Sequence, residues 1–302
     1  MKLVSYADIT QRVAIGLLQD SKILDLAAAG RRVNEAADLS SMLAVIRGGE
    51  VALAALRRIQ ARGAEFSELW TDVAQVRLLA PIPNPVRNVF CVGRNYLDHV
   101  KEGYAKVGTD LKLPQVPQFF TKATHAVNGP HGDIRYDPRV TQLLDYEVEL
   151  AVVLGRGGRD IPKDQALDHV FGYTVANDVT ARDLQRRHEQ WFKGKSLDTT
   201  CPLGPCLVDR GEIGDPRTLE LSLSVNGVER QRARVAQMIF DIPTIISSLS
   251  AGLTLDAGDI IATGTPAGVG FAMTPAQALK GGDQIVARID RIGELNNRVV
   301  AV

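Results

Sequence analysis

Three absences in this sequence of 302 residues argue against particular classes of protein. No stretch has the roughly 18 uninterrupted apolar residues that a membrane-spanning helix needs. The first eight residues already include Asp8 and lack the apolar core of a signal peptide. Net charge is also missing, because 35 Lys and Arg balance 35 Asp and Glu, so no field attracts nucleic acid or an anionic membrane. We therefore expect neither a nucleic-acid nor a membrane partner.

Cysteine is scarce as well. Only Cys91, Cys201 and Cys206 are present, an odd number without the spacing of a zinc site. Such a chain is typical of a reducing compartment, so we expect a cytoplasmic protein. A small buried apolar role explains each cysteine better than a nucleophilic one.

The length favours one large domain with a smaller one, and the apolar and charged fractions, 45% and 23%, are ordinary for a globular protein. We interpret residues 1–75 as the smaller unit. Short β-type runs near 2–6, 12–18 and 22–26 precede two helical patterns, at 40–47 and 50–62. The prolines of 81–85 mark a stiff boundary, because each fixes φ and removes a backbone donor. Residues 76–302 then form the larger domain.

Short β-branched runs between Gly, Pro and Asp dominate the larger domain. Asn226-Gly227 lies between two of them, which is the strongest short-range signal of a β-hairpin. Strands and helices do not alternate regularly, so we predict an α+β, β-rich fold with mostly antiparallel sheets and peripheral helices. The expected strands cover 88–92, 147–154, 172–176, 219–225, 259–263 and 284–289, and the expected helices 96–102, 181–190 and 242–249.

The segment Asp145-Tyr-Glu-Val-Glu-Leu-Ala-Val-Val-Leu154 carries the most chemical information. Strand side chains alternate between faces, so Glu147 and Glu149 share one face. An apolar continuation suggests an interior strand, where two adjacent carboxylates need a cation or a shared proton. Oxygen ligands favour Mg²⁺, Mn²⁺ or Ca²⁺. The alternative is an edge strand whose glutamates face water.

Asp178 is a second candidate ligand, at the end of the strand-like segment Val175-Ala-Asn-Asp178. Arg182 and Gln185 would follow on one helical face, where Arg182 could grip a substrate carboxylate with both arms of its guanidinium. The alternative role for Asp178 is to cap the helix that follows, which would use the same oxygens.

His99 and Glu102 are three residues apart in a predicted short helix. Glu102 can orient and charge-stabilise the imidazole, an arrangement that suits a general base acting on water. An ordinary surface pair is the alternative. Lys195, in Lys193-Gly-Lys195-Ser, precedes a turn rich in Pro and Gly and could place a fixed positive charge near a developing oxyanion. A solvated loop is the alternative for these neighbouring lysines.

The segment 260–270 is a buried-strand pattern that continues into a Gly-rich loop. Such loops can present backbone amides to an anion. It is not a phosphate-binding P-loop, because the Gly-Lys-Ser/Thr ending is missing and no helical pattern follows.

Taken together, these residues resemble the fumarylacetoacetate hydrolase family. The resemblance is strongest to the fumarylacetoacetate hydrolase domain-containing proteins of its acylpyruvase-like branch. The matching motifs occur in order across about 86–302, and residues 1–75 resemble the variable N-terminal domain of many members. The motifs are Gly93-Arg-Asn-Tyr-x-x-His99-x-x-Glu102, Phe120-Thr-Lys122, Asp145-x-Glu147-x-Glu149, Asn177-Asp178-Val-Thr-Ala-Arg182-Asp-x-Gln185, Gly194-Lys195-Ser, Cys201-Pro-Leu-Gly-Pro205 and Thr263-Gly-Thr265-Pro-x-Gly-Val-Gly270.

The resemblance implies a β-roll catalytic domain of mixed sheets, assembled as a homodimer. It implies Mg²⁺ or Mn²⁺, with Ca²⁺ as an alternative, held by Glu147, Glu149 and Asp178. The implied catalytic residues are His99, Glu102 and Lys195, and the implied substrate-binding residues are Arg94, Lys122, Arg182, Gln185 and Thr265. Fumarylacetoacetate hydrolase proper has a further metal-binding Asp where this chain has Val92, which argues against fumarylacetoacetate itself as the substrate.

The expected function is metal-dependent hydrolysis of a carbon–carbon bond in a small 2-oxo acid of the acylpyruvate type. His99 would activate water, and the cation with Lys195 would stabilise the pyruvate enolate. The same site could stabilise an enolate without water, so oxaloacetate decarboxylation and isomerisation of an unsaturated 2-oxo diacid are alternatives. A catalytically silent homologue that binds metal and ligand is the alternative from another class.

Overall fold

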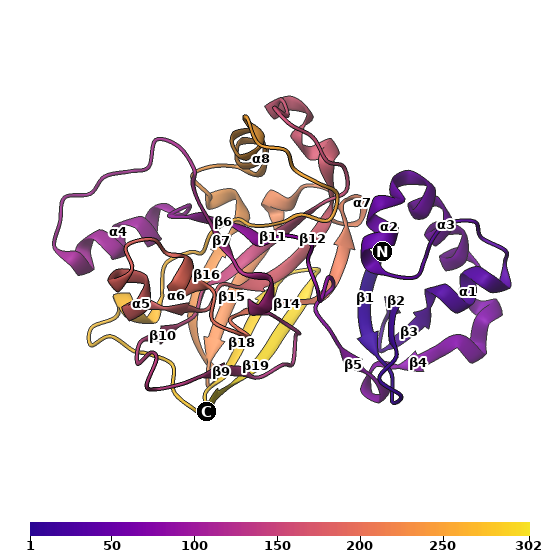
Figure 1. Cartoon of the computed structure of the whole chain (residues 1–302), viewed down its shortest axis with the longest axis horizontal. Coiled ribbons are helices and arrows are strands. Elements are labelled where there is room, and N and C mark those ends of the chain that lie inside the picture. The colour runs from indigo at the N-terminus through magenta and orange to yellow at the C-terminus, as the bar shows by residue number, and fades with distance from the viewer.

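The computed structural model describes residues 1–302 and arranges them in three sheets with helices around them (Figure 1). The largest sheet has 12 strands. Its central path runs in the order β4 (Trp70–Asp72), β3 (Lys22–Asp25), β2 (Val13–Gln19), β1 (Lys2–Ala7), β14 (Cys201–Asp209), β12 (Val170–Asn177), β11 (Val148–Leu154), β17 (Ile260–Ala262), β6 (Val89–Gly93) and β7 (Gln118–Lys122). The short strands β5 (Arg77–Leu78) and β8 (Val127–Asn128) pair with β1 and β14.

A second sheet of five strands packs against the first. Its order is β16 (Val228–Arg234), β15 (Glu220–Val225), β18 (Gln284–Ile289), β19 (Gly293–Ala301) and β9 (Ile134–Tyr136), and a small ribbon pairs β10 (Leu144–Asp145) with β13 (Thr180–Ala181). Parallel pairing is confined to β8 with β14, β6 with β17 and β9 with β19, so the predicted mostly antiparallel, β-rich α+β fold is confirmed. Asn226 and Gly227, with φ of 52° and 77°, form the predicted hairpin turn between β15 and β16.

Helices cover the ends of the molecule. The leading unit carries α1 (Leu26–Arg32), α2 (Met42–Arg47) and α3 (Gly49–Ala61), and the opposite end carries α4 (Leu97–Val107), α5 (Arg182–Arg187) and α6 (Phe192–Lys195) (Figure 1). Two further helices are α7 (Arg210–Ile213) and α8 (Ile242–Ser250). None of these helices is both long enough and apolar enough to cross a membrane.

Two of the helices differ from the predicted lengths. The helix predicted to end at 102 continues to Val107 and stops at Gly108, whose φ of 69° is the left-handed conformation that glycine adopts most easily. The helix predicted over 181–190 covers only 182–187, and Glu189 has a positive φ of 58°. Backbone turns end both helices, and side-chain periodicity does not reveal such turns.

Strand β11 has both faces in a hydrophobic core, which accounts for its fully buried pattern. Val148, Leu150 and Val152 belong to a core cluster of 41 residues shared with the five-stranded sheet. Ala151 and Val153 belong to a second cluster of 29 residues on the other face. The edge-strand alternative for this segment is therefore wrong, and its glutamates cannot be solvated surface residues.

Strand β14 corrects the prediction of a rigid turn after Lys195. Residues 201–209 form a buried central strand between β12 and β1, although they include Gly204 and two prolines. The β12–β14 register shifts next to Pro205, so this residue lies at an irregularity of the ladder, where a missing N–H donor is tolerated. Tertiary pairing overrides the local turn signal here.

The leading unit shares hydrogen bonds and core with the rest of the chain. Strand β1 pairs with β14 through Lys2 and Leu3, and β5 pairs back onto β1. The cluster of 29 buried residues includes Leu17 and Ile46 from the leading unit together with Leu203 and Leu207 from β14. The boundary after residue 75 stays a prediction, but the two parts stabilise each other through one continuous sheet.

Candidate active site

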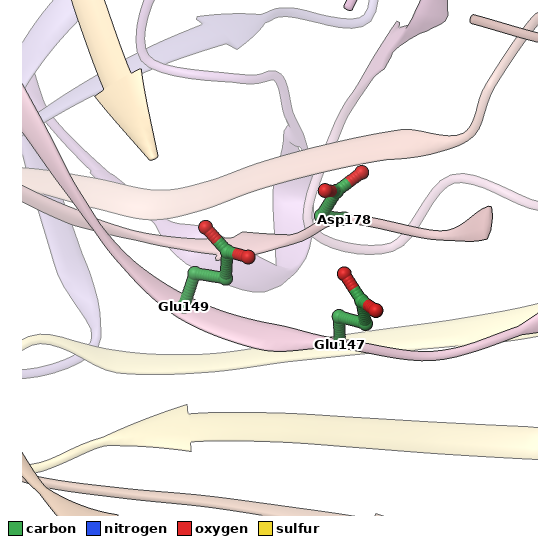
Figure 2. Close-up of side chains that lie close together, drawn as sticks. All are labelled: Glu147, Glu149 and Asp178. Atoms are coloured by element: carbon green, nitrogen blue, oxygen red, sulfur yellow. The ribbon is translucent and has the colours of Figure 1, made fainter. Parts of the chain in front are cut away.

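Three acidic side chains converge next to the centre of the large sheet. Glu147 immediately precedes β11, Glu149 lies within it, and Asp178 follows the last residue of β12. We call these three residues the carboxylate cluster. Each has one oxygen within 4.8 Å of the others, and the three residues are only 1–4% exposed (Figure 2). The strand alternation thus places the two glutamates on one side, as predicted.

The backbone explains how Asp178 reaches the glutamates. The Asp178 N–H donates to the carbonyl of Glu147 at 2.8 Å, and the Glu147 N–H donates to Oδ1 of Asn177 at 3.0 Å. These bonds extend the β11–β12 pairing beyond its last regular pair, Val148 and Asn177. Helix α5 has Ala181 at its N-cap and no side-chain cap, so Asp178 does not have the capping role that was the alternative.

Basic side chains neutralise two members of the cluster. The Lys195 ammonium donates to Glu147 Oε2 at 2.7 Å and to Asp178 Oδ2 at 2.6 Å. Lys122 donates to Asp178 Oδ1 at 2.7 Å, and Arg182 donates to Glu147 Oε1. Glu149 has no basic partner within 4.0 Å and accepts one hydrogen bond, from the Gly264 N–H at 2.8 Å.

The pKa shifts follow from this unequal pairing. Burial raises the pKa of Glu147, but Arg182 and Lys195 outweigh it and hold that pKa below its usual range. Burial, with repulsion from Asp178 and Glu147, raises the pKa of Glu149 well above its usual range. An ionised Glu149 would be a buried negative charge without a partner, so this carboxyl group needs either a proton or a cation.

The donor set fits a hard divalent cation. All three ligands are carboxylates, which suit Mg²⁺, Mn²⁺ or Ca²⁺. Each carboxylate oxygen has two acceptor positions, so Glu147 and Asp178 can keep their basic partners and also bind an ion. A cation at this position would supply the countercharge that Glu149 lacks.

The predicted His–Glu pair is present on α4. His99 Nδ1 lies 2.8 Å from Glu102 Oε1, and the two side chains are 13% and 21% exposed. Glu102 Oε2 also accepts the Gly268 N–H at 2.9 Å. The pair is thus partly buried and held from two sides, unlike an ordinary surface pair. The second ring nitrogen of His99 makes no hydrogen bond to the protein and can exchange a proton with a ligand.

The Gly-rich loop binds anions as predicted, and those anions are the protein's own carboxylates. Its amide N–H groups serve Glu149 (from Gly264), Glu102 (from Gly268) and Asp145 (from Gly270 and Phe271). Gly268 has a φ of 106°, and a Cβ there would lie 1.9 Å from the Arg230 carbonyl oxygen. One loop therefore positions a member of the carboxylate cluster and the partner of His99 together.

A pocket of about 490 Å³ opens above these groups. It brings together most of the predicted site residues, with aromatic and further charged side chains at its walls. The predicted site residues in its lining are Arg94, His99, Glu147, Glu149, Arg182, Gln185, Lys195 and Thr265. The lining also includes Tyr104, Arg186, Glu189, Trp191 and Phe271.

Two predicted substrate contacts need correction. Lys122 is fully buried and does not line the pocket, because its ammonium binds Asp178 Oδ1 and, at 2.9 Å, the Val179 carbonyl. It supports a member of the carboxylate cluster and does not face a ligand. Arg182 lines the pocket, but Asp145 and Glu147 already occupy its guanidinium, so a two-armed grip on substrate is not what the structure shows.

The site also includes two residues that the sequence did not predict, Asp145 and Gln231. Asp145 accepts N–H groups from Gly270, Phe271 and Arg182, and so fixes Arg182 beside Glu147. Gln231 on β16 is buried and donates to Thr265 Oγ1 at 2.8 Å. Thr265 in turn donates to the Val148 carbonyl at 3.0 Å, so its hydroxyl can only accept from a ligand. Asp145 stands in a quoted motif, but nothing near Gln231 in sequence indicates its role.

Comparison with known proteins gives the family. The family model described as Fumarylacetoacetate (FAA) hydrolase C-terminal matches residues 88–300. The chain is 45% identical over 299 residues to oxaloacetate tautomerase YisK of Bacillus subtilis (strain 168), covering 97% of this chain and 98% of that protein. This protein belongs to the fumarylacetoacetate hydrolase family.

Solved structures agree in fold over the whole length. Fumarylacetoacetate hydrolase from Exiguobacterium antarcticum is 40% identical with a TM-score of 0.81, and each chain is fully covered. Maleylpyruvate hydrolase from Sphingobium sp. SYK-6, in complex with manganese(II) ion and pyruvate, is 29% identical with a TM-score of 0.76, covering 100% of this chain and 99% of that one. The family and fold predictions are thereby confirmed, and family members include a tautomerase and hydrolases.

Proposed function

We propose that this protein is a divalent-metal-dependent tautomerase of small 2-oxo diacids, with oxaloacetate as the foremost substrate. The observation that carries the proposal is the pocket lined by Glu147, Glu149, Lys195 and His99. Asp178 is bonded to Lys195 and completes the carboxylate cluster, and Glu102 contacts His99. The near full-length likeness to an oxaloacetate tautomerase supports the alternatives given from the sequence, oxaloacetate decarboxylation or isomerisation of an unsaturated 2-oxo diacid, over carbon–carbon hydrolysis. Within them it points to keto–enol isomerisation of oxaloacetate, which the sequence did not indicate.

Keto–enol interconversion asks for two things that this site has. A proton must be exchanged between C3 and an acid–base group, and the proton of the C2 enol hydroxyl must be exchanged with solvent. The negative charge on the C2 oxygen of the enolate formed in between must be stabilised. A divalent ion held by Glu147, Glu149 and Asp178 would supply electrostatic stabilisation of that oxygen. Unlike hydrolysis, this reaction does not need the site to bind and activate a water molecule.

His99 is the proton carrier in this proposal. Glu102 engages Nδ1, which orients the ring, while the other nitrogen exchanges the proton at C3. Lys195 has a different role. Burial lowers the pKa of Lys195, but Asp178 and Glu147 outweigh burial and raise it above the usual value. Lys195 therefore stays charged, stabilises the enolate and does not accept protons.

Hydrolysis of acylpyruvates is the second candidate, favoured by the same His99–Glu102 pair, which could activate water. A product assay separates the two. The purified protein, supplied with Mg²⁺ or Mn²⁺, is given enol oxaloacetate and a panel of acylpyruvates. We expect the enol absorbance to decay faster than without enzyme, with no pyruvate released. Faster release of pyruvate from an acylpyruvate than conversion of enol oxaloacetate would reject the tautomerase in favour of the hydrolase.

We further propose that the protein works as a homodimer, as the family resemblance implies. Equilibrium sedimentation would measure the assembly directly, and a monomer at assay concentration would contradict it.

A further inference from the structure

Arg186 is a pocket-lining arginine with no acidic partner. It lies one helical turn after Arg182 on α5. Both guanidinium groups lie over the Phe271 ring, that of Arg186 4.9 Å and that of Arg182 5.3 Å from the ring centroid. Arg182 is buried and its guanidinium is bound to Asp145 and Glu147, whereas Arg186 is exposed and its guanidinium makes no hydrogen bond or ion pair with the protein. The donors of Arg186 are therefore free beside a ring that also touches the inner site.

Freedom from an acidic partner does not by itself single out Arg186, because other exposed arginines, such as Arg187 on the same helix, also have none. What distinguishes Arg186 is that it lines the pocket and lies over an aromatic ring. On the pocket wall, Arg94 is the other guanidinium without an acidic partner, seated over Tyr104 and Trp191 at 5.6 Å and 5.8 Å. An aromatic seat limits the motion of a guanidinium while leaving its N–H groups available.

We propose that Arg186 binds the distal carboxylate of a 2-oxo diacid and makes the pocket selective for diacids over monoacids. The inference rests on the proposed function, in which the 2-oxo group is held at the carboxylate cluster. A planar guanidinium presents two parallel donors to a carboxylate, so a second carboxylate is the group that best uses the free Arg186. Glu189, also on this wall, has the opposite charge and weakens the selection.

The test compares oxaloacetate with its 4-methyl ester, which has nearly the same shape but one charge fewer. Equilibrium binding of both is measured calorimetrically with Mn²⁺ present, for the wild type, Arg186→Gln and the matched control Arg187→Gln. Arg187 is the next residue on α5, exposed and outside the pocket lining. We expect Arg186→Gln to weaken diacid binding about 10- to 100-fold and to leave ester binding unchanged.

Further variants sharpen the result. Arg186→Lys should recover part of the loss, because it restores the charge without the planar fork. Glu189→Gln should shift the preference slightly towards the diacid. The proposal is overturned if Arg186→Gln behaves like Arg187→Gln, or if the wild type binds diacid and ester equally or binds neither.

Turnover is measured separately on the same proteins. Retained diacid preference without enol conversion would reject the proposed tautomerase and leave the Arg186 subsite standing. If the protein converts enol oxaloacetate and Arg186→Gln lowers turnover no more than Arg187→Gln does, the tautomerase stands and the Arg186 subsite is rejected.

Discussion

Acidic and basic side chains meet in two contrasting ways in this molecule. In the leading unit they pair at the surface, as Glu68 does with Arg32 and Glu65 with Arg62. Around the carboxylate cluster the side chains are buried, and four acids face three bases: Asp145, Glu147, Glu149 and Asp178 against Lys122, Arg182 and Lys195. The unmatched charge is that of Glu149.

The difference separates structural charges from functional ones. Water solvates an exposed pair, so losing one partner has a small effect on folding. A buried acid without a base is destabilising, and folds keep such groups mainly where they act on a ligand. The predictions below test this contrast, from the largest expected effect to the smallest.

The largest effect is expected from loss of the cation. Chelation should abolish enol conversion, and added Mg²⁺ or Mn²⁺ should restore it. Glu149→Gln should lower kcat/KM by at least about 10³-fold even with metal present, because the site then lacks one of three ligands. Enol absorbance and metal content are measured together. Full turnover with metal content confirmed as nil would contradict the metal dependence.

His99→Ala should lower kcat/KM for enol conversion by about 10²- to 10⁴-fold, the usual contribution of a positioned acid–base group. Glu102→Gln should cause a smaller loss, because it only orients and stabilises the imidazole. Metal binding should be unaffected in both variants, which provides the control. If His99→Ala kept full activity, another group would have to carry the proton.

The third effect concerns stability in the absence of divalent cations. The pKa of Glu149 is raised in the folded state from a value of 4.5, so the folded protein holds a proton that the unfolded chain releases. The resulting stability is full below about pH 4.5 and is lost as the pH rises through the folded pKa, at no more than about 1.4 kcal/mol per pH unit.

Urea unfolding at several pH values, with chelator present, measures this slope. Glu149→Gln should remove the part of the slope that comes from this residue and should make the cation-free protein more stable at neutral pH. The same pH dependence in wild type and variant would show that Glu149 is not the titrating group.

The smallest effect is expected in the leading unit. Glu65→Gln breaks the exposed pair with Arg62, and both the urea midpoint and its pH dependence should stay close to wild type. Glu149→Gln provides the comparison, since it makes the same substitution at a buried position. A loss of stability from Glu65→Gln comparable to the change at Glu149 would break the contrast between the two regions.

Local patterns were enough for the parts of the site that lie within one element. Alternation along β11 predicted that Glu147 and Glu149 share a face, and the spacing of three on α4 predicted the His99–Glu102 contact. Asn226-Gly227 predicted its hairpin for the same reason. In each case the geometry of a single strand, helix or turn determines which side chains meet.

Other features depended on partners far along the chain. Lys122 is 56 residues from Asp178, and Lys195 is 48 residues from Glu147, so no periodicity links them. The sequence therefore predicts Lys122 as a substrate contact and gives Arg182 a free guanidinium. In the structure both bases bind buried acids, because a buried carboxylate needs a countercharge and the fold brings these two bases near.

By itself, the sequence determined the β-rich class, the family and the acids that form the cluster, because these follow from strand and helix periods and from motifs in order. Only the tertiary structure decided that Cys201–Asp209 is a central strand, that β1 completes the same sheet, and that Glu149 is left without a base while Arg186 is left without an acid. Sheet pairing and charge neutralisation act between residues distant in sequence, so their outcome is set only when the chain has folded.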